Sequence, residues 1–169
     1  MALRNAERSE QGAFQPAFAS AVRLLSGKRL TRAQLVQKLR DRGFAPEAIE
    51  AAVSRCEAKR YIDDRTFAEL YVKSVLERKP VGPMRLLRDL LRYGIDQSVA
   101  RTAIAQIDDD EEQRIERALR KLEAMRPQDR FDQLAKRLER MGYGPPAIAR
   151  ALRRRSASGM ALDQLEELT

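Results

Sequence analysis

The hydrophobic positions along the chain form one pattern that occurs three times. In each copy, two leucines stand four residues apart, a glycine follows four residues after the second, and an apolar residue comes next. The three series are Leu35, Leu39, Gly43 and Phe44; Leu86, Leu90, Gly94 and Ile95; and Leu134, Leu138, Gly142 and Tyr143. The glycines are 51 and 48 residues apart, so the sequence predicts a repeat of about fifty residues.

Each copy of the pattern predicts two helices joined by a short turn. Leucines four residues apart lie on one face of a helix. A glycine in the left-handed conformation ends such a helix, and the apolar residue after it folds back, so we expect Phe44 to meet Leu39. The next helix begins at once, because Pro46 and Pro145 suit a first helical turn and Asp96 suits an N-cap.

A further amphipathic segment precedes each pair of helices. The predicted apolar faces are Phe18, Ala21, Val22 and Leu25; Phe67, Tyr71 and Val75; and Ile115, Ala118, Leu119 and Leu122. These segments are expected to end near Gly27, Pro80 and Pro127. Thr31 and Gln34 have the spacing of a capping box that opens the next helix. No segment alternates with a period of two for long enough to be a strand.

The elements together predict an all-α fold of about nine helices, arranged as three tandem three-helix repeats. A three-helix unit of this length buries little on its own, so we expect the repeats to stack into an elongated, curved array. The predicted organisation is a disordered N-terminus at 1–15, repeats at 16–62, 63–107 and 108–155, and a C-terminal tail at 156–169 whose sequence allows a short loose helix.

The composition argues against several kinds of site. The chain has no histidine and one cysteine, which excludes a disulfide framework and a Cys/His metal site. Cys56 lies in a helical stretch and is interpreted as a half-buried packing residue rather than a reactive thiol. No glycine-rich phosphate loop and no nucleophile beside a base are present, so we predict a protein that is not an enzyme and needs no cofactor or metal.

The hydropathy pattern predicts no membrane-spanning segment and no signal peptide. No stretch approaches the roughly 20 apolar residues that a bilayer span needs. The first residues, MALRNAERSEQGAF, lack the apolar centre of a signal peptide. We therefore expect a cytoplasmic protein without a membrane partner.

Charge is spread unevenly around a net value of +8. Residues 1–63 carry 12 Lys and Arg against 7 Asp and Glu, residues 64–107 carry 8 against 5, and residues 108–169 carry 13 of each. The positive excess therefore belongs to the first two thirds of the chain, where it favours a polyanion or an acidic protein groove as partner.

Ten basic residues are the candidate contacts with such a partner. They are Lys28, Arg29, Arg32, Lys38, Arg40, Arg42, Lys79, Arg85, Arg88 and Arg92. The last three follow at i, i+3 and i+7 and form one outward stripe. The leucines expected to face inward on the same helix are Leu86, Leu87, Leu90 and Leu91. Stacked repeats would align such stripes into a track for phosphates or carboxylates, and a solvated polar face is the alternative.

Three further features invite a chemical interpretation. Asp63 and Asp64 precede a helix and are interpreted as caps for its amides rather than as catalytic or metal-binding groups. Tyr61 is interpreted as a packing residue, with stacking on a base as the alternative. The acidic run from Asp108 to Glu112 is interpreted as a helix N-terminus rather than a cation site.

The middle repeat resembles the signature region of the RecX family, bacterial regulators of the RecA recombinase. The matching residues are Tyr61, Ile62, Asp63, Asp64, Phe67, Ala68, Lys79, Gly82, Pro83, Arg85, Leu86, Gly94 and Ile95. The stretch LTRAQLVQKLRDRGF resembles the start of the family's first repeat, with Gln34 where a Glu is usual; Asp89 likewise replaces a usual Glu. The likeness covers roughly residues 17–155 and is weaker in the third repeat.

The resemblance implies a function that composition and spacing do not reach. It implies a monomeric regulator of DNA repair and recombination, including the SOS response, that binds the RecA–DNA filament. Binding would lower ATP hydrolysis and strand exchange, with weak contacts to single- or double-stranded DNA. It also implies structural roles for Tyr61, Asp63, Asp64, Phe67, Gly82, Pro83 and Gly94.

Two other functions remain open at this point. A general DNA-binding module would act without a recombinase, although the second helix of each pair offers few side chains that could read bases. A helical adaptor for an unrelated partner is the third possibility.

Overall fold

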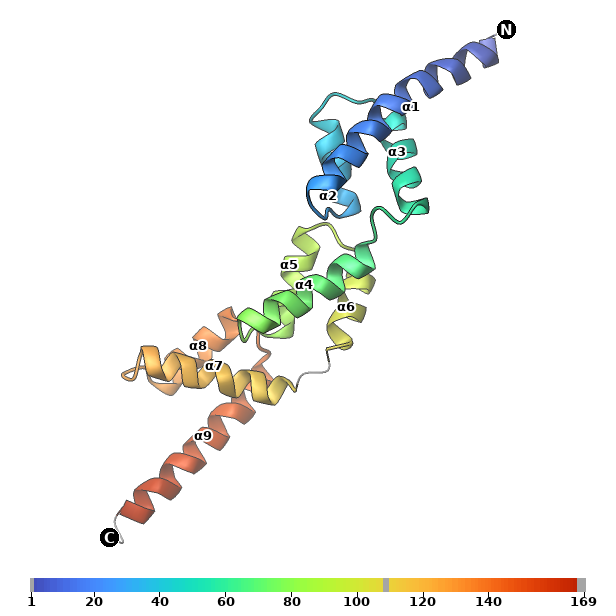
Figure 1. The fold of residues 1–169 in the computed structure, drawn as a ribbon. Coiled ribbons are helices and arrows are strands. Elements are labelled where there is room, and N and C mark those ends of the chain that lie inside the picture. Colours follow the sequence, from blue (N-terminus) through green and yellow to red (C-terminus); the bar gives the residue numbers. More distant parts are fainter. Residues whose placement is uncertain (1, 108–109, 167–169) are drawn as a thin grey trace. The chain divides into compact units, whose positions relative to one another are not determined.

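The computed structural model describes the backbone of residues 2–107 and 110–166, and the side chains of residues 15–107 and 110–157. Within those backbone ranges the chain forms nine α-helices and no strand, which confirms the all-α prediction. The helices are α1 Ala2–Gly27, α2 Arg32–Arg40, α3 Pro46–Ala58, α4 Asp64–Arg78, α5 Pro83–Arg92, α6 Gln97–Ala105, α7 Glu111–Met125, α8 Phe131–Arg140 and α9 Pro145–Glu166 (Figure 1).

The two ends of the chain differ from the sequence prediction. Helix α1 begins at Ala2, so the backbone is helical through the segment for which disorder was predicted. That segment is rich in Ala, Arg, Glu and Gln, which favour a helix even without an apolar face. Helix α9 likewise continues to Glu166 without a separate tail. The predicted domain boundaries are otherwise not tested and stay predictions.

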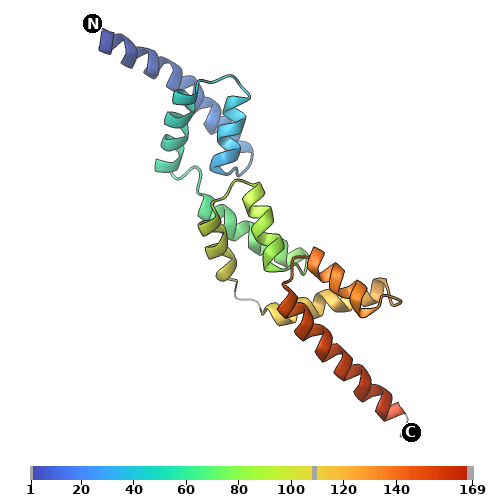
Figure 2. The same ribbon diagram turned by 180° about the vertical axis from the view of Figure 1, so that it is seen from behind.

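The chain divides into two compact units. One contains residues 1–71 and 90–103, and the other contains residues 72–89 and 104–169. Helices α4, α5 and α6 each contribute a part to both units. In the first unit α1 packs on α2 and α3, and in the second unit α7, α8 and α9 pack on one another, as both views show (Figures 1 and 2). The elongated, curved arrangement of the repeats stays a prediction.

The predicted leucine faces form the cores. In the first unit, Leu35 and Leu39 of α2 are fully buried in one cluster with Ile49, Val53 and Cys56 of α3. In the second unit, the corresponding cluster contains Ile115, Ala118, Leu119, Leu134, Leu138, Tyr143 and Ile148. Cys56 is fully buried, and not half-buried as predicted; burial raises the pKa of its thiol, which fits a packing role.

Two expected core positions are wrong. Val22 and Leu91 are 36% and 43% exposed. In each helix the buried position is the residue immediately before, Ala21 in α1 and Leu90 in α5. One residue is about 100° of helix rotation, which carries the next side chain away from the core.

All three repeat glycines end their helices as the sequence predicted. Gly43, Gly94 and Gly142 have φ values of 80°, 77° and 92°. In each turn the amide of the residue after the glycine donates to the carbonyl of the second leucine, at 3.1–3.4 Å. The glycine amide itself donates to the carbonyl three residues back, at 2.9 Å in every case. This pair of bonds is the Schellman ending of a helix.

Candidate partner-binding surface

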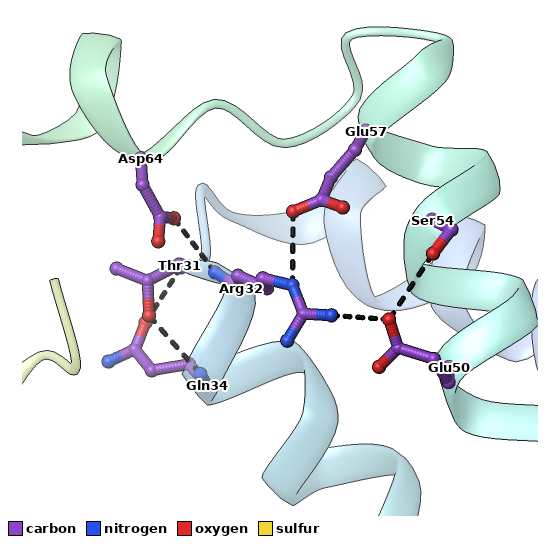
Figure 3. Close-up of polar contacts among 7 residues, drawn as sticks. All are labelled: Thr31, Arg32, Gln34, Glu50, Ser54, Glu57 and Asp64. Carbon is purple, nitrogen blue, oxygen red and sulfur yellow. Dashed lines mark hydrogen bonds and ion pairs between the residues drawn. The ribbon is translucent and has the colours of Figure 1, made fainter. Parts of the chain in front are cut away.

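The start of α2 carries the predicted capping box. Thr31 Oγ1 accepts a hydrogen bond from the Gln34 amide at 3.2 Å, and Gln34 Oε1 accepts one from the Thr31 amide at 3.3 Å. Arg32 follows directly, and its guanidinium reaches α3, where it pairs with Glu50 at 2.6 Å and Glu57 at 3.1 Å (Figure 3). The hydrogen bond to Glu50 raises the pKa of Arg32. These two ion pairs compete with any contact between Arg32 and a partner.

Asp63 and Asp64 both cap helices, but not the same helix. Asp63 accepts hydrogen bonds from the Thr66 amide and hydroxyl, both at 3.0 Å, and these bonds lower its pKa. Asp64 Oδ1 instead accepts from the Arg32 amide at 2.8 Å, so it caps α2 in the preceding repeat (Figure 3). The expectation that Asp64 caps its own helix is wrong. Spacing along the sequence relates Asp64 only to the helix that begins beside it, whereas the amide that it caps lies 32 residues earlier.

The contact made by Asp64 belongs to a larger interface, which we call the first joint. It joins the start of α2 (Thr31, Arg32, Ala33) to Asp64, Tyr93 and Gly94. Thr31 Oγ1 donates to the Tyr93 carbonyl at 2.7 Å. A Cβ atom added to Gly94 would overlap the Cβ atom of Ala33. The ring of Tyr93 also packs against Phe67 and Tyr71, with centroid distances of 5.4 and 5.2 Å.

An analogous interface, the second joint, lies in the other unit. It joins the start of α5 (Gly82, Met84, Arg85) to Met141 and Gly142 at the end of α8. The Gly82 amide donates to the Met141 carbonyl at 2.9 Å, and the Met84 amide donates to the Gly142 carbonyl at 3.1 Å. A Cβ atom on Gly82 would overlap the Gly142 carbonyl, and one on Gly142 would overlap the amide nitrogen of Arg85. At both joints the glycine turn of one repeat therefore lies against the helix start of the preceding repeat.

The joint formed by Asp64 leads to a stability prediction. Asp64→Ala removes the acceptor for the Arg32 amide and is expected to lower the free energy of unfolding by about 1 kcal/mol. Asp64→Asn keeps an oxygen acceptor and should cost less, since burial already raises the pKa of Asp64 and disfavours its charged form. Urea denaturation followed by circular dichroism measures both. Equal losses in the two variants would show that the charge, and not the acceptor, matters.

The predicted basic residues occupy different surroundings. Lys28, Arg29, Arg40, Arg42, Lys79, Arg85, Arg88 and Arg92 are exposed, whereas Arg32 and Lys38 are half-buried. Arg42 donates to Ser20, and Arg85 pairs with Asp89 at 3.1 Å. Arg85, Arg88 and Arg92 are thus all exposed on α5, where the stripe was predicted. Whether these residues contact a partner stays a prediction.

Tyr61 and its surroundings differ from expectation. Tyr61 is 49% exposed, so the structure does not support a packing role. It lines a hollow together with Arg29 and Arg60. Arg60 was missed by the sequence analysis, and it has a left-handed backbone with φ at 55°. Its signal in the sequence is its place directly before the Tyr-Ile-Asp-Asp turn, where a helix has just ended.

The acidic residues give no metal centre in the part of the chain that the structure describes. Among those residues no three His, Cys, Asp or Glu side chains come together. Asp110 is the N-cap of α7 and accepts from the Glu112 amide at 2.8 Å, which agrees with the predicted helix N-terminus. Asp108 and Asp109 of the same run lie outside the described residues. The described helices also include none that is long and apolar enough to cross a membrane.

Comparison with known proteins places these features in a family. A family model described as RecX, first three-helix domain, matches residues 17–56, and one described as RecX, second three-helix domain, matches residues 63–104. The regulatory protein RecX of Streptomyces coelicolor is 33% identical over 159 residues, which cover 88% of this chain and 85% of that protein. The regulatory protein RecX of Treponema pallidum is 31% identical over 140 residues, 82% of this chain and 76% of that protein.

Solved structures agree with this assignment at the level of the fold. The crystal structure of RecX from Lactobacillus salivarius is similar with a TM-score of 0.77 and 20% identity, over 85% of this chain and 97% of that one. A second crystal structure of a regulatory protein RecX gives a TM-score of 0.78 and 19% identity, over 89% of this chain and 77% of that one. Family models, sequence relatives and fold therefore agree, and this chain belongs to the RecX family of regulatory proteins.

Proposed function

We propose that this protein is a non-enzymatic inhibitor of a RecA-type recombinase that works in the cytoplasm as a monomer. It binds the recombinase–DNA filament, lowers ATP hydrolysis and strand exchange, and so regulates DNA repair and recombination, including the SOS response. The observation that carries the proposal is membership of the RecX family, whose relatives are named regulatory proteins.

The physical basis of the proposed binding is the set of exposed basic residues in the first two repeats. Arg88 and Arg92 stand four residues apart on α5 and are both exposed. Such side chains suit acidic groove walls or DNA phosphates. Because a few weak contacts from each repeat act together, a modest patch on each is sufficient for binding. The inhibitor then occupies the groove where duplex DNA or another subunit would go.

The test is ATP hydrolysis by the cognate recombinase on single-stranded DNA, titrated with the double variant Arg88→Glu/Arg92→Glu. We expect half inhibition to require about ten times more of this variant than of the wild type. This difference should become smaller at high salt, because salt screens the charges. Arg85 is left unchanged because it pairs with Asp89 and lies at the second joint. If the folded variant inhibited as well as the wild type, the basic stripe on α5 would not be the contact with the filament.

The chain offers a matched control for this test. Lys136 and Arg140 on α8 occupy the positions in the third repeat that Arg88 and Arg92 occupy in the second. Both are exposed, and residues 108–169, which include them, carry equal numbers of basic and acidic residues. Lys136→Glu/Arg140→Glu should inhibit like the wild type. A wild-type protein that leaves ATP hydrolysis unchanged while binding bare DNA would contradict the proposal and favour a general DNA-binding module.

The stoichiometry of the same titration separates two modes of action. Inhibition far below one copy per recombinase subunit would indicate capping of growing filament ends. Inhibition only near saturation would indicate occupation of the groove.

A further inference from the structure

The turn between α3 and α4 carries a hollow of about 440 Å³ in the first unit. This volume is within the range of roughly 300–1,000 Å³ that is typical of small-molecule sites. Its apolar lining includes Leu30 and Ile62, which are buried, and Phe67, which is half-buried. Arg29, Arg60 and Tyr61 line it with exposed side chains. An apolar lining, an exposed aromatic ring and two guanidinium groups are thus gathered in one place.

The backbone at this turn is held in an unfavourable conformation. The Arg60 amide donates to the Glu57 carbonyl and the Tyr61 amide donates to the Cys56 carbonyl, both at 2.8 Å. These bonds are the same Schellman ending that Gly43, Gly94 and Gly142 make. Here the left-handed position is taken by Arg60, with φ at 55°, although glycine would adopt it without strain. Strained positions of this kind cluster at functional sites, so the turn at Arg60 is a candidate for one.

The chemistry of the lining favours one class of ligand. A nucleotide of a single strand combines a phosphate, which pairs with guanidinium groups, and a flat base, which stacks on an aromatic ring. An acidic peptide would match the arginines but would leave the ring of Tyr61 and the apolar lining without a complementary group. Asp63 also lines the hollow, and its carboxylate stays negative because the bonds from Thr66 lower its pKa. It would repel any anion, so the phosphate has to lie beside Arg29 and Arg60 and away from Asp63.

We infer that the hollow formed by Arg29, Arg60 and Tyr61 binds one nucleotide of single-stranded nucleic acid. The base stacks on Tyr61 above the apolar lining, and the phosphate pairs with Arg29 and Arg60. This inference goes beyond the proposed function and does not rest on it, because the site would bind a strand with or without a recombinase.

The experiment uses the full chain, a fluorescently labelled oligothymidine of about 20 nucleotides, and anisotropy without any recombinase. We expect Tyr61→Ala to weaken binding by about 5- to 100-fold, the range given by the loss of one stacked base. Tyr61→Phe keeps the aromatic face and should bind nearly as well as the wild type. Equal binding by Tyr61→Ala and the wild type would overturn the inference. A loss of the same size on a blunt DNA duplex would also overturn it, because paired bases cannot stack on the ring.

A second variant separates binding from folding. Arg60→Gly relieves the left-handed backbone, so the urea midpoint should rise while affinity for the strand falls and the salt dependence becomes shallower by about one unit of slope. Arg101→Gln, which removes one exposed charge from α6 in the same unit, is the matched control and should leave affinity almost unchanged. Unchanged affinity in a folded Arg60→Gly protein would overturn the role of Arg60. Since no recombinase is present, failure here leaves the proposed inhibition to be judged by its own assay.

Discussion

Gly142→Ala is expected to lower the free energy of unfolding of the second unit by about 3 kcal/mol. Two costs add together. An alanine at a φ of 92° is strained, which costs about 1 kcal/mol or more. The new methyl group would also overlap the amide nitrogen, Cα and Cβ of Arg85, which are held by the first turn of α5 and cannot rotate away. Urea denaturation followed by circular dichroism at 222 nm measures the loss.

The second joint predicts how Gly142→Ala acts. The Gly142 carbonyl accepts from the Met84 amide, and the neighbouring Met141 carbonyl accepts from the Gly82 amide. Moving α5 away to relieve the overlap would therefore break main-chain hydrogen bonds as well as packing. Gly82→Ala should be similarly costly, because its methyl group would overlap the Gly142 carbonyl. If Gly142→Ala lowered the free energy of unfolding by only about 1 kcal/mol, the loss would equal the backbone strain alone. The second joint would then open without cost.

Gly94→Ala is expected to cost about 2–3 kcal/mol, whereas Gly43→Ala should cost about 1 kcal/mol. The two glycines have nearly the same φ, 77° and 80°, and both end their helices in the same way. They differ in their neighbours. A methyl group on Gly94 would overlap the Cβ atom of Ala33, while one on Gly43 would have no atom within 4 Å.

Comparing Gly94→Ala with Gly43→Ala therefore isolates the cost of overlap at the first joint, because the backbone strain is nearly the same in both variants. Both variants are compared in the same urea denaturation experiment, and the difference between their losses is the cost of the overlap. Ala33→Gly in the Gly94→Ala background removes the overlapping methyl group and should recover part of that difference, less the cost of a glycine in a helix. Equal losses for Gly94→Ala and Gly43→Ala would contradict the close approach of α2 to Gly94.

Features that depend on near neighbours in the sequence were predictable. The left-handed glycines, the capping box of Thr31 and the N-cap of Asp96 follow from spacings of a few residues, and each is present. The helix faces were predicted nearly as well. Val22 and Leu91 were misplaced because a hydrophobic residue next to a buried one looks like part of the same face. In a thin three-helix repeat the buried face is narrower than the apolar pattern.

Features that depend on contacts between repeats were not predictable. Gly94 and Gly142 were understood as helix ends, but each also allows another helix to approach its backbone. Asp64 was assigned to its own helix because the amide that it caps lies 32 residues earlier. The exposure of Tyr61 and the strained backbone of Arg60 were not predicted for a related reason. Their surroundings are formed by residues 29 and 30 as well as by the local turn.

The two joints bear on how much such a sequence can change over evolution. The second joint is made by amide and carbonyl groups and requires glycine at two positions, so most of its side chains are free to differ. Mutations elsewhere on the surface then accumulate without separating the repeats. A joint of this kind is compatible with a fold that matches a solved structure with a TM-score of 0.77 at 20% sequence identity. Side chains around the second joint can therefore change, whereas a larger residue at Gly82 or Gly142 would overlap the backbone opposite.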